Sequence, residues 1–330
     1  MIFLKKYNLF YFWLYLMTPI FMMYLNNYFS IWIFMELNLV LFITLLIINS
    51  KFLGDKIMKY YFINSLSSMV FLFFMNLMLI NKNWNFILIM NLMILIKLGM
   101  FPFHLWFIDM MIYLNWTMCF FLMTWQKIIP LLLIMYMYNL KLIIMVSILG
   151  GLFSSMMIFN QIFLKKLLAY SSINHLSWML ISLILGSKIW LIYFFSYMII
   201  NYSITYIFKI LEMNEFSSLY IYKMNYFKNF LFLLMLSLGG IPPLFGFLMK
   251  LIFSFEIMML NNFFLLMLMF FYSLIFLFNY LNLNLNFFLM YSYNLNFKKM
   301  IFLKKLNFNF FNMMILLSTM NLFFMAFWIL

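Results

Sequence analysis

The stretch NFILIMNLMILIKLGMFPFHLWFI, residues 85–108, decides the fold of this chain. Its first twelve residues carry no charge, and the run then meets Lys97, Gly99 and Pro102. An apolar run of about 20 residues is long enough to cross a bilayer core as a helix. Proline interrupts the helical hydrogen-bond ladder. The stretch therefore predicts a transmembrane helix that breaks inside the bilayer, next to a lysine.

The whole chain shares this apolar character. Of its 330 residues, 69% are hydrophobic, 24% are aromatic and only 8% are charged, whereas soluble domains carry about 25% charged residues. The apolar runs are continuous rather than alternating, which argues against a transmembrane β-barrel. The sequence therefore predicts an all-α, polytopic transmembrane helical bundle.

Charge and cysteine content exclude several other classes of protein. The net charge of +14 comes entirely from lysines in short clusters between apolar runs, which is typical of topology signals rather than of a nucleic-acid surface. The chain has a single cysteine, Cys119, two distant histidines and no glycine-rich phosphate loop. We therefore expect no bound metal, cofactor or nucleic acid in this chain.

Amino-acid bias indicates the origin of the sequence. Phe (48) and Met (37) are abundant, alanine is nearly absent and arginine is absent, a bias toward AT-rich codons. This favours a compact AT-rich genome, such as that of an animal mitochondrion. The first apolar run shows neither a cleavage site nor an arginine-rich presequence, so we expect synthesis inside the organelle.

Cutting the chain at charged or asparagine-rich breaks predicts eleven spans, at about 7–25, 29–49, 59–80, 85–108, 116–137, 141–160, 167–186, 189–210, 228–252, 255–280 and 307–329. They suggest a first five-helix unit at 1–138 and a second at 139–280. An interfacial connector at 281–306 and a C-terminal transmembrane helix at 307–330 would follow.

The lysines between the spans predict the orientation. An odd number of helices places the two termini on opposite sides of the membrane. Of the seventeen lysines outside the spans, only Lys82, Lys141 and Lys188 then fall on the side away from the N-terminus. Because lysines concentrate on the side of synthesis, we expect the N-terminus to face the matrix.

Four charged residues lie within predicted spans: Glu36, Lys97, Lys127 and Lys250. A charge at the bilayer centre costs roughly 2.5–3.5 kcal/mol on insertion scales. A buried ion pair with Glu36 would neutralise one of the three lysines and leave the other two without a counter-charge. This favours a proton or ion path. Burial lowers the pKa of a lysine in general and a nearby carboxylate raises it, so such a contact can switch proton affinity.

Two predicted spans carry breaking residues beside a lysine: Gly99 and Pro102 after Lys97, and Gly239, Gly240, Pro242 and Pro243 before Lys250. A single proline is often only a packing kink, but broken helices beside ionisable residues typically mark transport sites. The broken span is the fourth in each set of five. An odd number of helices per unit predicts that the second unit is inverted, with His175 as the counterpart of Glu36.

Three further residues are candidates for supporting roles: His175, Lys166 and His104. His175 follows Lys166 in a polar stretch early in one span, where it could relay protons or simply hydrogen-bond a neighbouring helix. His104 lies just past the first break, near Trp106 and Asp109, where we expect an interface anchor.

Six strings resemble one known family. They are MELN (35–38), KYYF (59–62), KLGMFPFHLW (97–106), TWQKIIP (124–130), KKLLAYSSINHL (165–176) and GGIPPLFGFLMK (239–250), in this order and up to about residue 256. Together they resemble chain 2 of mitochondrial NADH–ubiquinone oxidoreductase, an antiporter-like membrane subunit family of respiratory complex I. Animal members with eleven helices agree with the predicted span count. Asp109 departs from the glutamate that is commoner there.

The resemblance implies a proton-translocating membrane-arm subunit of NADH:ubiquinone reductase in the mitochondrial inner membrane. NADH oxidation and ubiquinone reduction, with FMN and iron–sulfur clusters, would occur in other chains. Glu36 and Lys97 would match the family's carboxylate–lysine pair, Lys127 its central relay and Lys250 the lysine of the second broken helix. Implied partners are other membrane-arm subunits, accessory subunits and lipids such as cardiolipin. The N-terminus would lie in the matrix and the C-terminus in the intermembrane space.

Two other functions remain open at this point. One is a stand-alone cation/proton antiporter on the same scaffold, which purification as an active single chain would favour. The other is a structural anchor without transport, which dry and fully paired lysines would favour.

Overall fold

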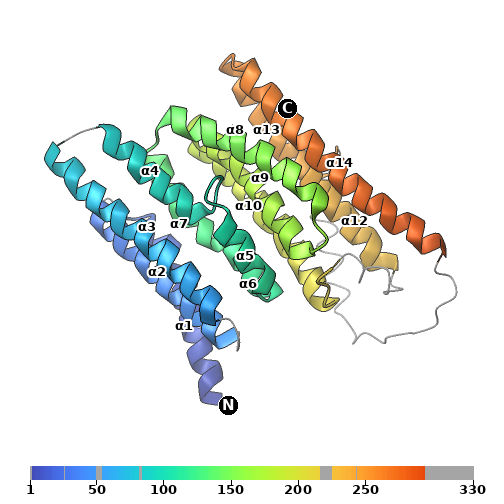
Figure 1. Ribbon diagram of the computed structural model, residues 1–330, viewed down its shortest axis with the longest axis horizontal. Helices are drawn as coiled ribbons and strands as arrows, with labels where there is room; N and C mark the ends of the chain where they lie inside the picture. Colours follow the sequence, from blue (N-terminus) through green and yellow to red (C-terminus); the bar gives the residue numbers. More distant parts are fainter. Residues whose placement is uncertain are drawn as a thin grey trace. The chain divides into compact units, whose positions relative to one another are not determined.

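The computed structural model describes residues 2–25, 27–49, 54–81, 84–215, 225–242 and 244–293 (Figure 1). The helices are α1 Ile2–Met22, α2 Tyr28–Asn49, α3 Gly54–Asn81, α4 Trp84–Leu98, α5 Leu105–Tyr113, α6 Trp116–Met123, α7 Trp125–Tyr136, α8 Leu140–Met157, η1 Ile158–Asn160, α9 Leu164–Leu185, α10 Ser187–Ile210, α12 Asn225–Gly239, α13 Phe245–Met259 and α14 Phe263–Tyr293.

The predicted all-helical fold is confirmed. Across the described ranges the only extended pairing is an isolated bridge between Phe163 and Glu215. Seven helices or joined helices there are long and apolar enough to cross a membrane: Tyr28–Asn49, Gly54–Ile80, Trp116–Tyr136, Leu140–Met157, Leu164–Leu185, Ser187–Ile210 and Phe263–Leu283. The count of eleven spans stays a prediction, and the helix expected at 307–330 lies outside the described residues.

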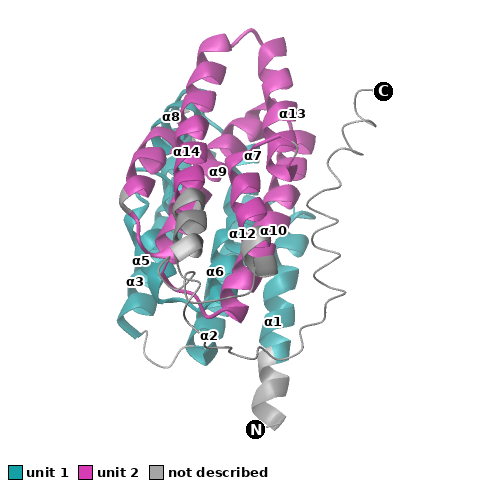
Figure 2. Cartoon of the chain, turned by 90° about the vertical axis from the view of Figure 1, so that its right-hand side faces the viewer, with its two compact units in different colours: residues 1–150 teal, residues 151–330 magenta. Residues whose placement is uncertain are grey.

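The first compact unit comprises residues 1–150, drawn in teal in Figure 2. Its helices α1, α2, α3 and α4 pack against one another in chain order. α7 packs against α4 and α1, and α5 packs against α3. α4 and α5 are the two halves of the predicted broken fourth span, so they place the break within this unit.

The second compact unit comprises residues 151–330, drawn in magenta in Figure 2. α9 lies at its centre, because 94% of its best membrane-spanning window is buried. It packs against α10, α13 and α14. α12 and α13 are the halves of the second broken helix, and both pack against α10 and α14.

Some element boundaries differ from the predicted ones. α13 continues to Met259, past the predicted end at 252. α14 continues to Tyr293, into the predicted connector, because asparagines weaken a helix but that stretch contains no glycine or proline to end it. The rest of the connector and Pro243 lie outside the described residues. The division into two inverted repeats stays a prediction.

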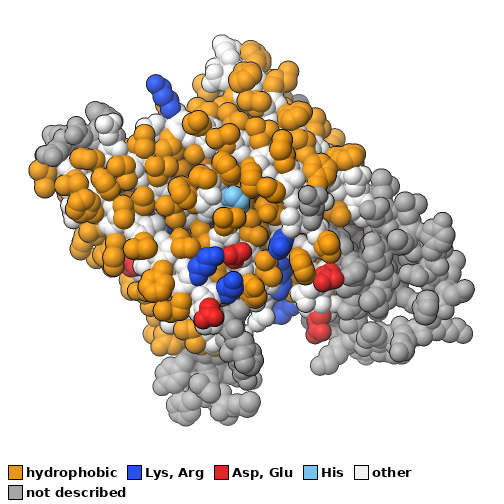
Figure 3. Space-filling model, in the orientation of Figure 1, with side chains coloured by type: hydrophobic (Ala, Val, Ile, Leu, Met, Phe, Trp, Pro, Cys, Tyr) orange, Lys and Arg blue, Asp and Glu red, His pale blue; other side chains and the backbone are white. Residues whose placement is uncertain are grey.

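Apolar side chains dominate the described part of the face that Figure 3 shows. Leu79, Met259 and Phe264 each expose more than 70% of their area. By contrast, asparagines and serines such as Asn38, Asn91 and Ser172 are buried. Exposed apolar side chains, with asparagines and serines buried among the apolar residues of the core, are the pattern expected of a protein whose surrounding solvent is lipid.

Candidate functional site: buried lysines at two helix breaks

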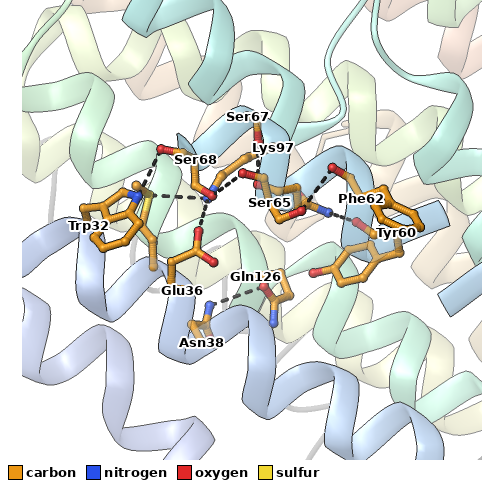
Figure 4. Close-up of polar contacts among 12 residues, drawn as sticks. Trp32, Glu36, Asn38, Tyr60, Phe62, Ser65, Ser67, Ser68, Lys97 and Gln126 are labelled. Atoms are coloured by element: carbon orange, nitrogen blue, oxygen red, sulfur yellow. Dashed lines mark hydrogen bonds and ion pairs between the residues drawn. The ribbon is translucent and has the colours of Figure 1, made fainter. Parts of the chain in front are cut away.

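The carboxylate of Glu36 and the ammonium of Lys97 lie side by side in unit 1. Glu36 is on α2 and Lys97 is in the last turn of α4, with 3.8 Å between Lys97 Nζ and Glu36 Oε1. The Lys97 side chain is 8% exposed and that of Glu36 is 25% exposed. Figure 4 shows the two side chains pointing toward each other. Of the three lysines within the spans, Lys97 is the one that Glu36 faces.

The break that follows α4 is held by residues from α5. Gly99 has a φ of +66°, a region that only glycine enters readily, and a Cβ there would lie 2.8 Å from the Phe107 Cβ. The indole Nε1 of Trp106 donates a hydrogen bond of 3.0 Å to the carbonyl oxygen of Ile96. The break therefore leaves Lys97 at a helix C-terminus, whose partial negative charge stabilises a cation.

Lys97 and Lys127 line the same cavity of about 30 Å³. A space of this size holds two or three water molecules at most, since each needs roughly 10–15 Å³ measured in this way. Four neutral polar side chains are also part of its otherwise apolar lining: Asn38, Tyr60, Asn64 and Gln126. Within the described residues, the buried Nζ of Lys127 has no hydrogen-bond partner, and it lies 4.8 Å from the centre of the Phe107 ring. The cavity therefore gives two lysines a common polar environment.

A chain of side-chain hydrogen bonds runs beside this cavity and joins three helices. Thr18 Oγ1 donates to Asn38 Oδ1 (3.2 Å), and Asn38 Nδ2 donates to Gln126 Oε1 (3.3 Å; Figure 4). Gln126 Nε2 in turn donates to the Tyr15 hydroxyl at 3.3 Å. The contacts fix the side chain of Gln126, the residue immediately before Lys127.

Lys250 lies at the second break, in unit 2. It is 4% exposed, and its Nζ donates a 2.7 Å hydrogen bond to the carbonyl oxygen of Gly239, the last residue of α12. The ammonium also lies 5.7 Å from the centre of the Trp178 ring. Gly240 has a φ of +84°, and a Cβ there would lie 2.9 Å from Lys250 Nζ. The lysine itself therefore joins the two halves of this broken helix.

α13 approaches α12 closely at one further point. A Cβ built on Gly246 would lie 1.6 Å from the carbonyl oxygen of Ser237, a separation that no side chain tolerates. The absence of a side chain at position 246 thus permits the packing that keeps Lys250 near the end of α12.

The histidines and Lys166 occupy three separate environments. His175 is buried on α9, with its Nδ1 2.9 Å from the Tyr193 hydroxyl, and it lies one turn from Trp178. Lys166, near the start of α9, lies 5.5 Å from the centre of the Phe163 ring. Whether His175 relays protons stays a prediction.

Whether His104 anchors the chain at the membrane interface stays a prediction. His104 is buried and stacks on Phe101 with 5.8 Å between ring centroids, and Trp106 is buried too. The reason is that α5 continues the broken span, so its first turn lies inside the bundle. Asp109, further along α5, is exposed and pairs with Lys59.

The predicted site residues therefore gather in two places. In unit 1, Lys97 and Lys127 line one cavity, and Glu36 pairs with Lys97. Unit 2 holds Lys250 at its own break.

Comparison with known proteins identifies the family to which this chain belongs. A model of the family described as the transmembrane part of NADH:quinone oxidoreductase/Mrp antiporters matches residues 79–277. NADH-ubiquinone oxidoreductase chain 2 of Anopheles gambiae is 35% identical, over 86% of this chain and 85% of the mosquito protein. The chain belongs to the NADH-ubiquinone oxidoreductase chain 2 family. The family member of Aedes aegypti is 41% identical over 52% of this chain and 50% of its own length.

The fold of this chain is also similar to that of a chain in a solved respiratory complex. A chain in the structure of respiratory complex I from Thermus thermophilus superposes with a TM-score of 0.76 at 19% identity, covering 88% of this chain and 72% of that one. This chain and that bacterial chain therefore share the helical fold described above.

Sequence reasoning missed part of the site in this member of the chain 2 family. It did not assign roles to Asn38 or Gln126, because neutral amides in an apolar span give no distinct pattern. It also missed the interruption at Thr124 between α6 and α7, three residues before Lys127, where φ is −119° and ψ is −72°. No glycine or proline marks that position, so only the backbone reveals it.

Proposed function

We propose that this chain is a proton-translocating membrane-arm subunit of respiratory complex I. It would couple NADH oxidation and ubiquinone reduction in neighbouring subunits to proton movement through its buried lysines. The observation that carries the proposal is the Glu36–Lys97 pair beside a helix break, with Lys97 on the cavity that Lys127 also lines. Family membership supports it.

The energetics of the pair suit a switch. At 3.8 Å, two unit charges attract by about 4 kcal/mol in an effective dielectric of about 20. Taking each ion out of water costs several kcal/mol, so attraction and desolvation nearly balance. A small change in the separation or hydration of the pair would therefore change which protonation state of Lys97 is favoured.

The proposed path gives each charged residue one task. Glu36 modulates the proton affinity of Lys97, and Lys127 takes the proton through the shared cavity. Lys250 serves in unit 2 and passes a proton toward the exit or the next subunit. The hydrogen bond to the carbonyl of Gly239 would hold the Lys250 amino group at the break.

The proposed setting is the mitochondrial inner membrane, with the N-terminus in the matrix and the C-terminus in the intermembrane space. Other membrane-arm and accessory subunits would be the partners. FMN and iron–sulfur clusters would belong to other chains of the complex. Bound lipids such as cardiolipin fit the apolar exterior.

The decisive test is Lys97→Met in the assembled complex, with Glu36→Ala in parallel. We expect either change to lower coupled NADH:ubiquinone turnover about tenfold or more, because a positioned proton-transfer group contributes roughly 10²–10⁴-fold. Native electrophoresis should show normal assembly. Lys141→Met, at an exposed position at the start of α8, is the control and should retain full turnover. Normal rate and normal proton-to-electron ratio in both variants would contradict the proposal.

The second candidate is a stand-alone cation/proton antiporter. The family description, which also names Mrp antiporters, favours keeping it. Mild detergent purification separates the two: partner chains that cannot be removed without loss of activity support the complex. Cation/proton exchange by the purified single chain in vesicles would support the antiporter instead.

A further inference from the structure

α3 and α5 contact each other at three successive levels in unit 1. The outermost is Lys56, whose Nζ lies 4.9 Å from the centre of the Tyr113 ring. Next comes the ion pair of Lys59 Nζ with Asp109 Oδ2 at 2.7 Å, where the side chains are 47% and 41% exposed. The third level is the aromatic pair of Tyr60 with Trp106.

The aromatic pair separates the exposed ion pair from the cavity. The ring centroids of Tyr60 and Trp106 are 5.6 Å apart, both residues are buried, and both line the cavity of Lys97 and Lys127. Tyr60 directly follows Lys59 on α3, and Trp106 lies one turn before Asp109 on α5. Along this contact, the structure therefore passes from an exposed carboxylate to two buried lysines across one aromatic layer.

The orientation of Tyr60 distinguishes it from an ordinary packing residue. Figure 4 shows its hydroxyl directed toward the side on which Gln126 lies, and both residues line the cavity. Its ring also contacts Phe42, with 5.7 Å between centroids, so the aromatic layer is supported from α2. Behind it on α3, Asn64 is buried and lines the cavity as well.

From this arrangement we infer that the α3–α5 contact is the proton entrance of unit 1: Asp109 takes up the proton at the surface, and the Tyr60 hydroxyl passes it by Trp106 into the cavity. The inference rests on the proposed function and supplies its missing uptake step. It places the entrance at the N-terminal end of α3, on the side where α1 also begins.

The proton balance is simple. A proton from water binds the Asp109 carboxylate and leaves it for the Tyr60 hydroxyl oxygen, which releases its own proton toward Lys97 or Lys127. A phenol both donates and accepts hydrogen bonds, so Tyr60 regains its original state. The amine of the receiving lysine becomes an ammonium. Lys59 holds Asp109 in place but is not on the route.

Tyr60→Phe in the assembled complex is the central test, because it removes one oxygen and keeps the ring that packs on Trp106. We expect proton uptake and coupled turnover to fall about tenfold, part of the roughly 10²–10⁴-fold that a positioned transfer group contributes. Tyr61→Phe is the matched control: Tyr61 is the next residue of α3, is 38% exposed and does not line the cavity, so turnover should be unchanged.

Variants of the ion pair separate uptake from a structural role. Asp109→Asn should slow coupled turnover as much as Tyr60→Phe does. Asp109→Glu, which keeps the carboxylate, should restore turnover. Lys59→Met should turn over much faster than Asp109→Asn. If Lys59→Met and Asp109→Asn are equally slow, the pair is structural and the inference is wrong. It is also wrong if Tyr60→Phe and Asp109→Asn turn over normally while Lys97→Met is slow. If Lys97→Met is normal as well, the proposed function itself fails.

Discussion

Lys127 differs from the other two buried lysines in what compensates its charge. Lys97 faces Glu36, and Lys250 donates to the carbonyl of Gly239. In the described part of the chain, Lys127 Nζ has only the face of the Phe107 ring and the cavity. A buried charge with so little compensation destabilises the fold. At the scale of a residue, we therefore expect Lys127 to contribute to function rather than to stability.

This reasoning predicts opposite effects on stability and activity. Lys127→Met replaces a buried amino group that has no hydrogen-bond partner among the described residues with an apolar chain of similar length, so the complex should resist heat at least as well as the unmodified one. Coupled turnover should fall about tenfold or more. The check is a melting curve of the purified complex alongside its turnover. A clear loss of thermal stability would show that the charge is part of the packing instead.

The neighbouring amide gives a contrasting prediction. Gln126→Leu leaves Asn38 Nδ2 without its acceptor and the Tyr15 hydroxyl without its donor. Each unsatisfied buried group costs roughly 1–3 kcal/mol. We therefore expect Gln126→Leu to lower the melting temperature of the complex, whereas Gln126→Glu retains an acceptor for Asn38 and should lower it less.

At the scale of elements, the breaks are what give the site its geometry. Gly99→Ala would impose a Cβ on a residue at φ +66° and 2.8 Å from Phe107 Cβ. The backbone conformation alone costs roughly 1–2 kcal/mol for a non-glycine residue. We expect reduced assembly of the complex, measured on native gels. Gly54→Ala is the matched control, because a Cβ there meets nothing within 4 Å, and its assembly should be normal.

The same scale shows what could be predicted from the sequence. Span positions and the break after Lys97 follow from apolar run length and from Gly99 and Pro102, whose effects are local. The end of α14 and the interruption at Thr124 do not, because neither has a glycine or proline to mark it. The shared cavity of Lys97 and Lys127 depends on which helices pack together, and residue pattern alone does not determine that.

At the scale of the whole molecule, the lysine distribution makes orientation testable on a single helix. Lys188 and Lys209 are exposed near the two ends of α10, 21 residues apart, which at 1.5 Å per residue is about 30 Å, the thickness of a bilayer core. We expect Lys209→Cys to react with a membrane-impermeant thiol reagent from the matrix side only. Lys188→Cys should react from the opposite side only.

The native thiol gives little background in that experiment, since Cys119 is buried and is the chain's single cysteine. Labelling of both positions from the same side would contradict the assignment of α10 as a membrane-crossing helix. Labelling from exchanged sides would invert the proposed orientation and leave the span intact.

The close approach of Gly246 to the Ser237 carbonyl limits which mutations the gene can tolerate. Most apolar positions in this chain face lipid or packed side chains, so drift among Phe, Leu, Ile and Met should be tolerated there. Position 246 tolerates no such substitution, because even a methyl group would clash with the backbone of α12. In a genome that has kept only eight glycine codons in this gene, we expect variants at this codon to be lost from populations while its apolar neighbours diversify.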